Sequence, residues 1–124
     1  MTIFEATLAS EIMGNSAVAS IAGDRIYPLR LPANPTLPAA TYRLISSPRV
    51  LTQQGAKMTR PRYRWDCWAL VYDDAVALAV AIAKASGTSF NGWVDEEMDH
   101  QEEETGLFRR RLETLAWTDA EEAT

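Results

Sequence analysis

The hydrophobic and polar positions along the chain change period several times, and each change predicts a new element. Apolar residues recur at helical spacing up to Met13, and Thr2 with Glu5 three positions later is typical of a capping box at the start of that helix. A short second helix is expected over Ser16–Ile21 and should stop at Gly23, because glycine is the usual residue after a helix end.

Prolines and glycines predict where the following segments begin and end. The four prolines between Pro28 and Pro38 exclude a helix, so Arg25–Leu31 is expected to be an edge segment that leads into a loop. Asp73 or Asp74 is expected to cap a long helix that runs through Ala85 and stops at Gly87.

Alternating patterns predict two central strands. Ala40–Ser46 is the first and Arg62–Val71 the clearest, with Tyr63 and Trp65 on the core face and Arg62 and Arg64 on the other. Between them, Ser47–Pro61 lacks an apolar period, so it is predicted to be a long mobile loop with a functional role.

A hairpin is expected after the long helix. Its strands are predicted over Ser89–His100 and Leu107–Trp117, with a turn over Gln101–Gly106. A turn centred near Glu103 and Glu104 would place two opposite-charge pairs across the strands. These pairs are Asp99 with Arg109 and Glu97 with Arg111.

These elements predict an α+β fold: a largely antiparallel sheet with two main helices packed on one face and a long mobile loop. The whole chain, 1–124, is expected to be a single domain, with the loop at 47–61 and a frayed acidic tail at 118–124. No apolar run is long enough for a membrane span, and the single cysteine excludes an internal disulfide. A soluble protein from a reducing compartment is expected.

The net charge of -5 conceals a strong asymmetry along the chain. Residues 25–65 hold eight basic side chains and no acidic one, whereas residues 66–124 hold fourteen acidic and four basic side chains. Two interpretations stay open. The two halves either neutralise each other within one fold, or the basic edge of one subunit contacts the acidic edge of the next and builds a ring.

Catalytic patterns are scarce, and no enzyme activity, cofactor or metal site is predicted. His100 lacks partners on a rigid scaffold and is expected at the surface, and Cys67 is expected to be a small buried core residue. The acidic run from Asp95 to Glu104 lacks the ligand spacing of a calcium loop. The low isoelectric point, about 4.8, argues against stable DNA binding.

The four tryptophans indicate an interface. Trp65 is expected in the core, but Trp68 shares a strand face with Arg62 and Arg64, so both faces of the sheet carry apolar bulk. Because the helices cover one face only, aromatic surface is expected to remain for a partner, which favours oligomerisation.

Three stretches resemble the tail-completion family of tailed bacteriophages, whose members include tail terminators and head-to-tail joining proteins. They are Asp24–Pro28, Leu37–Ser46 and Arg64–Ala75, and the resemblance spans Leu8 to about Trp117. The acidic stretch from Asp95 to Glu104 does not match the family pattern.

The resemblance implies a structural virion protein of a siphophage, a prophage or a tail-like particle, assembled in the bacterial host cytoplasm. Such a subunit would form a ring, usually a hexamer, that caps the tail tube, ends its polymerisation and offers a surface to the head connector. DNA would pass through the lumen without specific binding. The alternatives are another neck or minor tail component on the portal side, and a small metal- or ligand-binding domain or enzyme built around His100.

Two sets of candidate interface residues follow from these observations. The loop residues expected to contact the tail tube are Arg49, Lys57 and Arg60. Those expected between subunits are Arg62, Arg64, Trp68, Asp95, Glu97 and Asp99.

Overall fold

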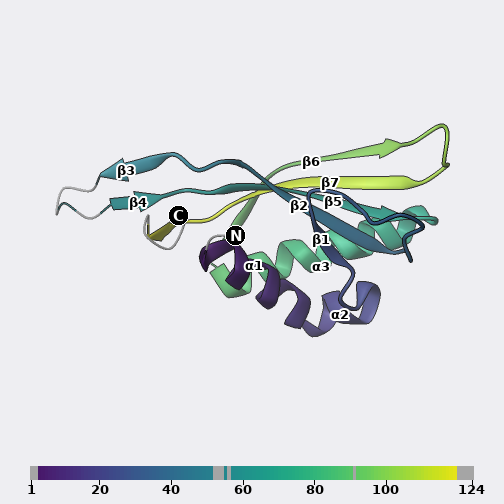
Figure 1. Cartoon of the computed structure of the whole chain (residues 1–124), viewed down its shortest axis with the longest axis horizontal. Helices are drawn as coiled ribbons and strands as arrows, with labels where there is room; N and C mark the ends of the chain where they lie inside the picture. The colour runs from purple at the N-terminus through teal and green to yellow at the C-terminus, as the bar shows by residue number, and fades with distance from the viewer. Residues whose placement is uncertain (1–2, 52–54, 56, 91, 120–124) are drawn as a thin grey trace.

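The computed structural model describes residues 3–51, 55, 57–90 and 92–119 and confirms an α+β fold. Three helices lie together on one side of a sheet (Figure 1). The helices are α1 (Ile3–Gly14), α2 (Ser16–Ala22) and α3 (Tyr72–Phe90). The strands are β1 (Ile26–Pro28), β2 (Ala39–Ser46), β3 (Arg49–Leu51), β4 (Lys57–Thr59), β5 (Arg62–Ala69), β6 (Trp93–Gln101), β7 (Phe108–Leu115) and β8 (Thr118–Asp119).

The strands form two sheets, and the chain passes from one sheet to the other between β2 and β3, between β4 and β5, and between β7 and β8. The main sheet has the order β1-β2-β5-β7-β6, and only its edge pair β1-β2 is parallel. The small sheet has the order β3-β4-β8 and continues the line of β2, β5 and β7 beyond the body (Figure 1). The edge position of β1 agrees with the proline-rich sequence around it, because proline removes a ladder donor.

The core lies between the helices and the main sheet. Tyr63, Trp65 and Cys67 alternate along β5 toward the helices, where each is buried, as the sequence predicted. Trp65 is fully buried against Tyr42 at a ring distance of 5.5 Å, and its indole Nε1 donates to Thr114 Oγ1 at 3.1 Å. The polar end of this tryptophan is therefore satisfied inside the core.

Local signals explain the ends of the second helix. Asn15 caps α2, since its Oδ1 accepts from the backbone N–H groups of Ala17 and Val18 at 3.0 and 3.2 Å. Gly23 follows the helix with a φ of 58°, so the predicted stop is confirmed. The predicted capping box at Thr2 lies outside the described residues.

The long helix does not stop where the sequence predicted. α3 continues through Gly87 to Phe90, because Ala85 and Ser86 in its last turns are buried and tertiary packing outweighs the cost of a glycine in a helix. β6 accordingly begins at Trp93, later than the predicted Ser89.

The loop prediction for Ser47–Pro61 is wrong in part. β3 and β4 within it are paired, with Arg49 opposite Thr59 and Leu51 opposite Lys57. Thr59 is fully buried, and its hydroxyl donates to Pro48 O at 3.0 Å and contacts the Ser47 hydroxyl. The segment lacks an apolar period because it makes a projecting hairpin with little core to face. We call residues 47–61 the arm.

Two further expectations change. The hairpin register is shifted by one: Asp99 faces Arg110 and Glu97 faces Leu112. Gly106, at a φ of 71°, closes a six-residue turn in which Glu102 N–H donates to Leu107 O, so the turn has the predicted length but lies one residue further along the chain, at 102–107. The frayed tail predicted over 118–124 is wrong at its start, because Thr118 and Asp119 pair with β4; residues 120–124 lie outside the described residues.

Candidate functional site

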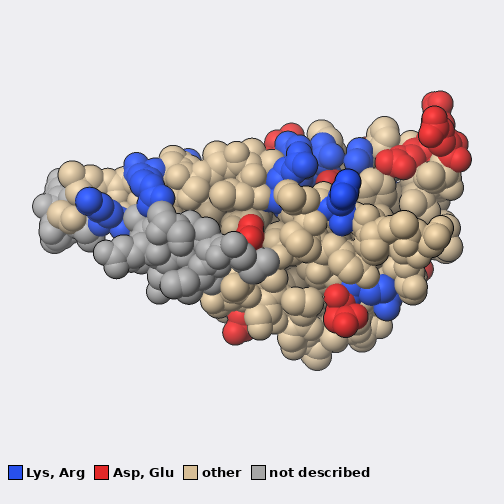
Figure 2. Space-filling model, in the orientation of Figure 1, with Lys and Arg blue, Asp and Glu red and all other residues tan. Residues whose placement is uncertain are grey.

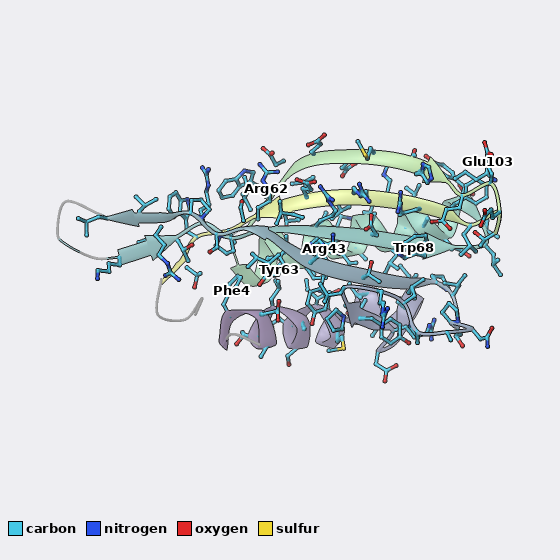
Figure 3. The ribbon with its side chains drawn as sticks, turned by 45° about the horizontal axis from the view of Figure 1, so that its top comes forward. Phe4, Arg43, Arg62, Tyr63, Trp68 and Glu103 are labelled. Carbon is cyan, nitrogen blue, oxygen red and sulfur yellow. The ribbon has the colours of Figure 1, made fainter. Side chains whose placement is uncertain are left out.

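The sheet face opposite the helices is a dense array of charged side chains, and we call it the open face (Figure 3). Alternation along β5 places Arg62, Arg64, Asp66 and Trp68 there, each only partly exposed. The register with β7 adds the side chains that lie directly opposite on the same face. These are Glu113, Arg111 and Arg109.

Ion pairs within the chain link the strands of this face. Glu113 binds Arg62 and Arg64, each at 2.9 Å, and Arg62 also binds Asp95 at 2.6 Å. Burial alone would raise the pKa of Glu113, but the hydrogen bonds from Arg64 and Arg62 outweigh it and lower the pKa overall. Asp66 Oδ1 lies 2.8 Å from Arg111 Nε and 3.8 Å from Arg109 Nε.

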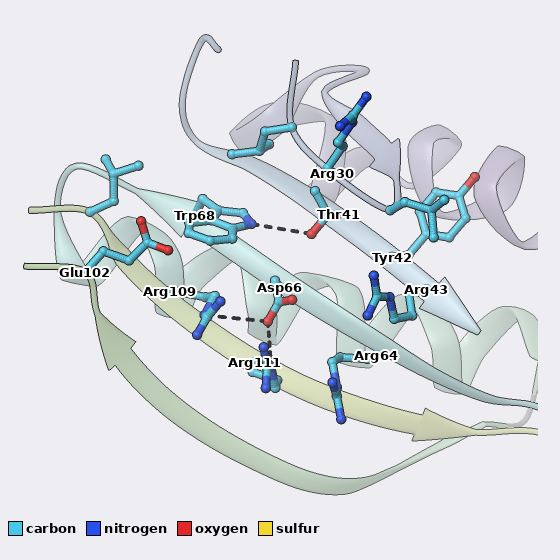
Figure 4. Close-up of a pocket in the computed structure, with 13 residues that line it drawn as sticks. Arg30, Thr41, Tyr42, Arg43, Arg64, Asp66, Trp68, Glu102, Arg109 and Arg111 are labelled. Atoms are coloured by element: carbon cyan, nitrogen blue, oxygen red, sulfur yellow. Dashed lines mark hydrogen bonds and ion pairs between the residues drawn. The ribbon is translucent and has the colours of Figure 1, made fainter. Parts of the chain in front are cut away.

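A groove of about 430 Å³ opens on this face between the segment after β1 and strands β2, β5 and β7 (Figure 4). Trp68 lines it, with its Nε1 3.4 Å from Thr41 Oγ1 and the Arg109 guanidinium 5.0 Å from its ring centre. Two carboxylates, Asp66 and Glu102, lie among five arginines. The arginines are Arg30, Arg43, Arg64, Arg109 and Arg111. We call this hollow the cationic groove.

A second polar cluster ties the β6–β7 hairpin to the start of α3. Arg110 binds Asp99 at 2.9 Å and Glu97 at 3.0 Å, and the Tyr72 hydroxyl donates to Asp99 at 2.7 Å. Asp99 has a lowered pKa because of the hydrogen bond from Tyr72 and the nearby Arg110, although partial burial opposes this. The cluster faces the helix side of the sheet, since Arg110 shares a face with buried Cys67.

The arm is the other distinctive surface. It projects away from the body (Figure 1), and basic side chains lie along it at the surface (Figure 2). Every residue of β3 is exposed, and Leu51 and Val50 expose 69% and 42% of their surface. Exposed apolar side chains beside basic ones, on a segment with no core to cover, are typical of a contact surface.

The candidate tube-contact residues occupy different parts of the arm. Arg49 and Lys57 lie on its paired strands and are exposed. Arg60 lies at the base, only partly exposed, with its guanidinium 5.8 Å from the centre of the Trp117 ring. Arg49 and Lys57 thus line one surface hollow of the arm, whereas the Arg60 guanidinium lies against Trp117.

The candidate subunit-contact residues are already engaged inside the chain. Arg62, Arg64 and Asp95 share the ion pairs of the open face, while Glu97 and Asp99 bind Arg110 on the helix side. Trp68 is half-buried beneath Arg109. The charged members of this set are therefore paired with opposite charges inside the same chain, as the first of the two charge interpretations expected.

Sequence reasoning missed the cationic groove. Arg30 and Arg43 come from segments far along the chain from Arg109 and Arg111, and only the strand order brings them to one hollow. The available signal was alternation in β2, which places Arg43 on the face opposite buried Tyr42, but the neighbouring strand could not be identified.

No catalytic constellation is found among the described residues. His100 is exposed on β6, and Cys67 is fully buried, which raises the pKa of its thiol and keeps it protonated. In the described parts of the chain, no three His, Cys, Asp or Glu side chains are grouped to hold a metal ion. None of the helices there has both the length and the apolar character to cross a membrane.

Comparisons with known proteins bear on the fold and the family of the chain. Among solved structures, the chain is similar to one chain of the "Virion of native gene transfer agent (GTA) particle", with a TM-score of 0.67 and 13% sequence identity over 91% of this chain and 92% of that chain. At this identity the likeness shows the fold alone. Among curated proteins, no sequence matches. The family model described as "Tail completion protein gp17" matches residues 6–119, nearly the whole length, so the chain belongs to the tail completion protein gp17 family.

Proposed function

We propose that this tail completion protein is a ring-forming subunit that caps the tail tube, ends its polymerisation and offers a surface to the head connector. Family membership makes the chain a structural tail protein of a phage-like virion, in a family that is not one of enzymes. The ring, its hexameric state and both partners belong to the proposal. So does the passage of DNA through the lumen, where the net negative charge of the chain would oppose binding to phosphates.

The arm is the observation that carries this proposal. It extends from the body as a paired hairpin with exposed Val50 and Leu51 and the basic Arg49 and Lys57. A single arm offers only a small contact area. Several arms held by one ring would bind a tube together, because linked weak contacts act at high effective concentration. This requirement supports capping by an assembled ring rather than by a free subunit.

Substitution tests the arm better than deletion. Removing Val50–Thr59 would also remove β4 and the buried Thr59, to which β8 is paired. Val50→Asp with Leu51→Asp instead changes only exposed side chains. Val80→Asp with Leu70→Asp is the matched control, since these residues expose 46% and 69% of their surface on other elements.

The assay is addition of each variant to purified tail tubes, with tube lengths measured by electron microscopy. We expect the arm variant to fold normally and leave tubes uncapped, while the control caps them. An arm variant that caps tubes as well as the wild type would contradict the role of the arm. Wild-type protein that binds the portal end of the connector and ignores tubes would favour the alternative, a neck component.

A further inference from the structure

We propose that the cationic groove receives the acidic turn of the β6–β7 hairpin from a second copy of the chain, so that subunits join head to tail. The turn comprises residues 102–107; Glu102 and Leu107 at its base line the groove of their own chain, so the side chains that would enter the neighbouring groove are Glu103 and Glu104 at its tip. This inference rests on the proposed ring-forming function and names the side chains that would hold neighbouring subunits together. A head-to-tail contact between two different surfaces generates a closed ring when its rotation closes.

The groove has more positive charge than its own chain neutralises. Asp66 is shared by Arg111 and Arg109, and Glu113 holds Arg64. Within the described chain, Arg43 and Arg30 form no ion pair and are both exposed. The buried Arg109 Nε also has no hydrogen-bond acceptor among the described residues. Guanidinium groups left over in this way favour an anionic partner with several acceptor oxygens.

The acidic turn has an excess of negative charge, which would complement the positive charge of the groove. Glu103 and Glu104 are exposed and form no ion pair with any residue that the structure describes. Glu103 lies at the outer end of the hairpin, where acidic side chains gather and project from the body (Figures 2 and 3). Two adjacent carboxylates on a projecting turn can enter a neighbouring subunit without moving its backbone.

The size and chemistry of the groove fit a peptide turn better than a nucleic acid. Its volume of about 430 Å³ lies in the range of pockets that enclose a compact ligand. Asp66 and Glu102 among the arginines would repel a continuous phosphate backbone, whereas discrete carboxylates can be placed between them. The chain itself supplies those carboxylates, so a second copy is the occupant that the charges favour.

The experiment uses the full chain with each surface reversed separately. Arg43→Glu alters the groove, and Glu103→Lys with Glu104→Lys alters the turn. Lys84→Glu on α3 and Glu11→Lys on α1 are controls, because both residues are exposed on the helices, away from the sheet. Mass by light scattering is measured at several protein concentrations and again on purified tail tubes, so that a ring formed only on the tube is also detected.

We expect either altered variant alone to associate at least about tenfold more weakly than the wild type, while both controls assemble normally. The two altered variants mixed together retain one intact groove and one intact turn, so they should form a heterodimer and stop there. A purely structural effect of either substitution would not produce that species.

Three results would overturn the inference. Wild-type assembly by both altered variants would place the subunit contact elsewhere and leave the ring proposal intact. Absence of a heterodimer from the mixture, when the single variants are weakened, would show that the two surfaces do not meet. Loss of binding to a short duplex DNA by Arg43→Glu, with assembly unchanged, would make the groove a nucleic-acid surface. A wild type that is monomeric both in solution and on tubes would instead refute the ring itself.

Discussion

Glu113 is the residue on which the open face depends most directly. Its side chain, 12% exposed, forms ion pairs with Arg62 and Arg64 on the neighbouring strand. Arg62 also forms an ion pair with Asp95 on β6. Without this carboxylate, two half-buried guanidinium groups would lose their acceptor. The same residue therefore links three strands and gives the face a measurable dependence on pH.

We expect stability to fall in acid through Glu113. Its pKa in the fold lies below the ordinary value of 4.5, so the unfolded chain takes up the proton first. The stabilisation is therefore complete above about pH 4.5 and is lost as pH falls through the lower folded pKa. Glu113→Gln should cost about 1–3 kcal/mol at pH 7, as expected for hydrogen bonds to charged groups, and should flatten the loss in acid.

Urea unfolding between neutral and acidic pH measures this effect. Glu11→Gln is the control, since Glu11 is exposed on α1, away from the proposed subunit contact, and has no ion pair within the described chain. If Glu113→Gln lost stability in acid as steeply as the wild type, the pH dependence would have to come from other carboxylates. Asp99, which also has a lowered pKa, would then be the next residue to change.

At the scale of elements, the end of α3 shows how packing overrides a local signal. Gly87 predicts a stop, yet the helix continues, and Gly92 closes its end by donating to Ser86 O at 3.2 Å. The two glycines differ in their surroundings. A Cβ on Gly87 would make only an ordinary contact, 3.6 Å from Gly92 O, whereas one on Gly92 would lie 3.0 Å from Leu115 O.

We therefore expect Gly87→Ala to stabilise the protein by about 0.5–1 kcal/mol, because alanine restricts the unfolded chain and suits the helix. Gly92→Ala is the matched comparison and should destabilise, since its Cβ meets backbone atoms that cannot move freely. Thermal unfolding of both variants measures the difference. A destabilised Gly87→Ala variant would mean that α3 does not continue through this position in solution.

At the scale of the whole molecule, charged side chains lie on both faces of the main sheet and at the tip of the β6–β7 hairpin. The open face and the Arg110 cluster use many of them internally, and the groove and the acidic turn keep an excess of opposite sign. Surface ion pairs contribute little each to a fold, but a contact between subunits depends on them more strongly. Assembly should thus respond to salt before folding does.

We expect the mass in solution to decrease when salt is raised from about 50 mM to about 1 M, because the Debye length falls to about 3 Å at 1 M. Circular dichroism over the same range should stay constant, since the core between α3 and the sheet is apolar. Size-exclusion light scattering measures the mass. An assembly that keeps its mass at every salt concentration would show that apolar contacts, rather than charges, hold the subunits together.

Much of the fold could be predicted because it depends on local periodicity. The alternation of Tyr63 and Trp65 with Arg62 and Arg64 determines which face of β5 is buried, and Gly23 ends α2 through its own backbone freedom. The register of the β6–β7 hairpin was off by one because it depends on where the turn lies, and the six-residue turn that Gly106 closes begins one residue later than its composition indicated.

The sequence by itself determined the fold class, the buried face of the central strand and the absence of a recognisable catalytic motif, since each follows from residue types at fixed spacing. Only the tertiary structure decided which charges meet. Arg62 pairs with Glu113, Arg43 joins Arg109 in one groove, and β4 joins β8, because strand order brings together residues that are distant in the chain. Local patterns cannot encode that order, as it follows from the packing of the whole chain.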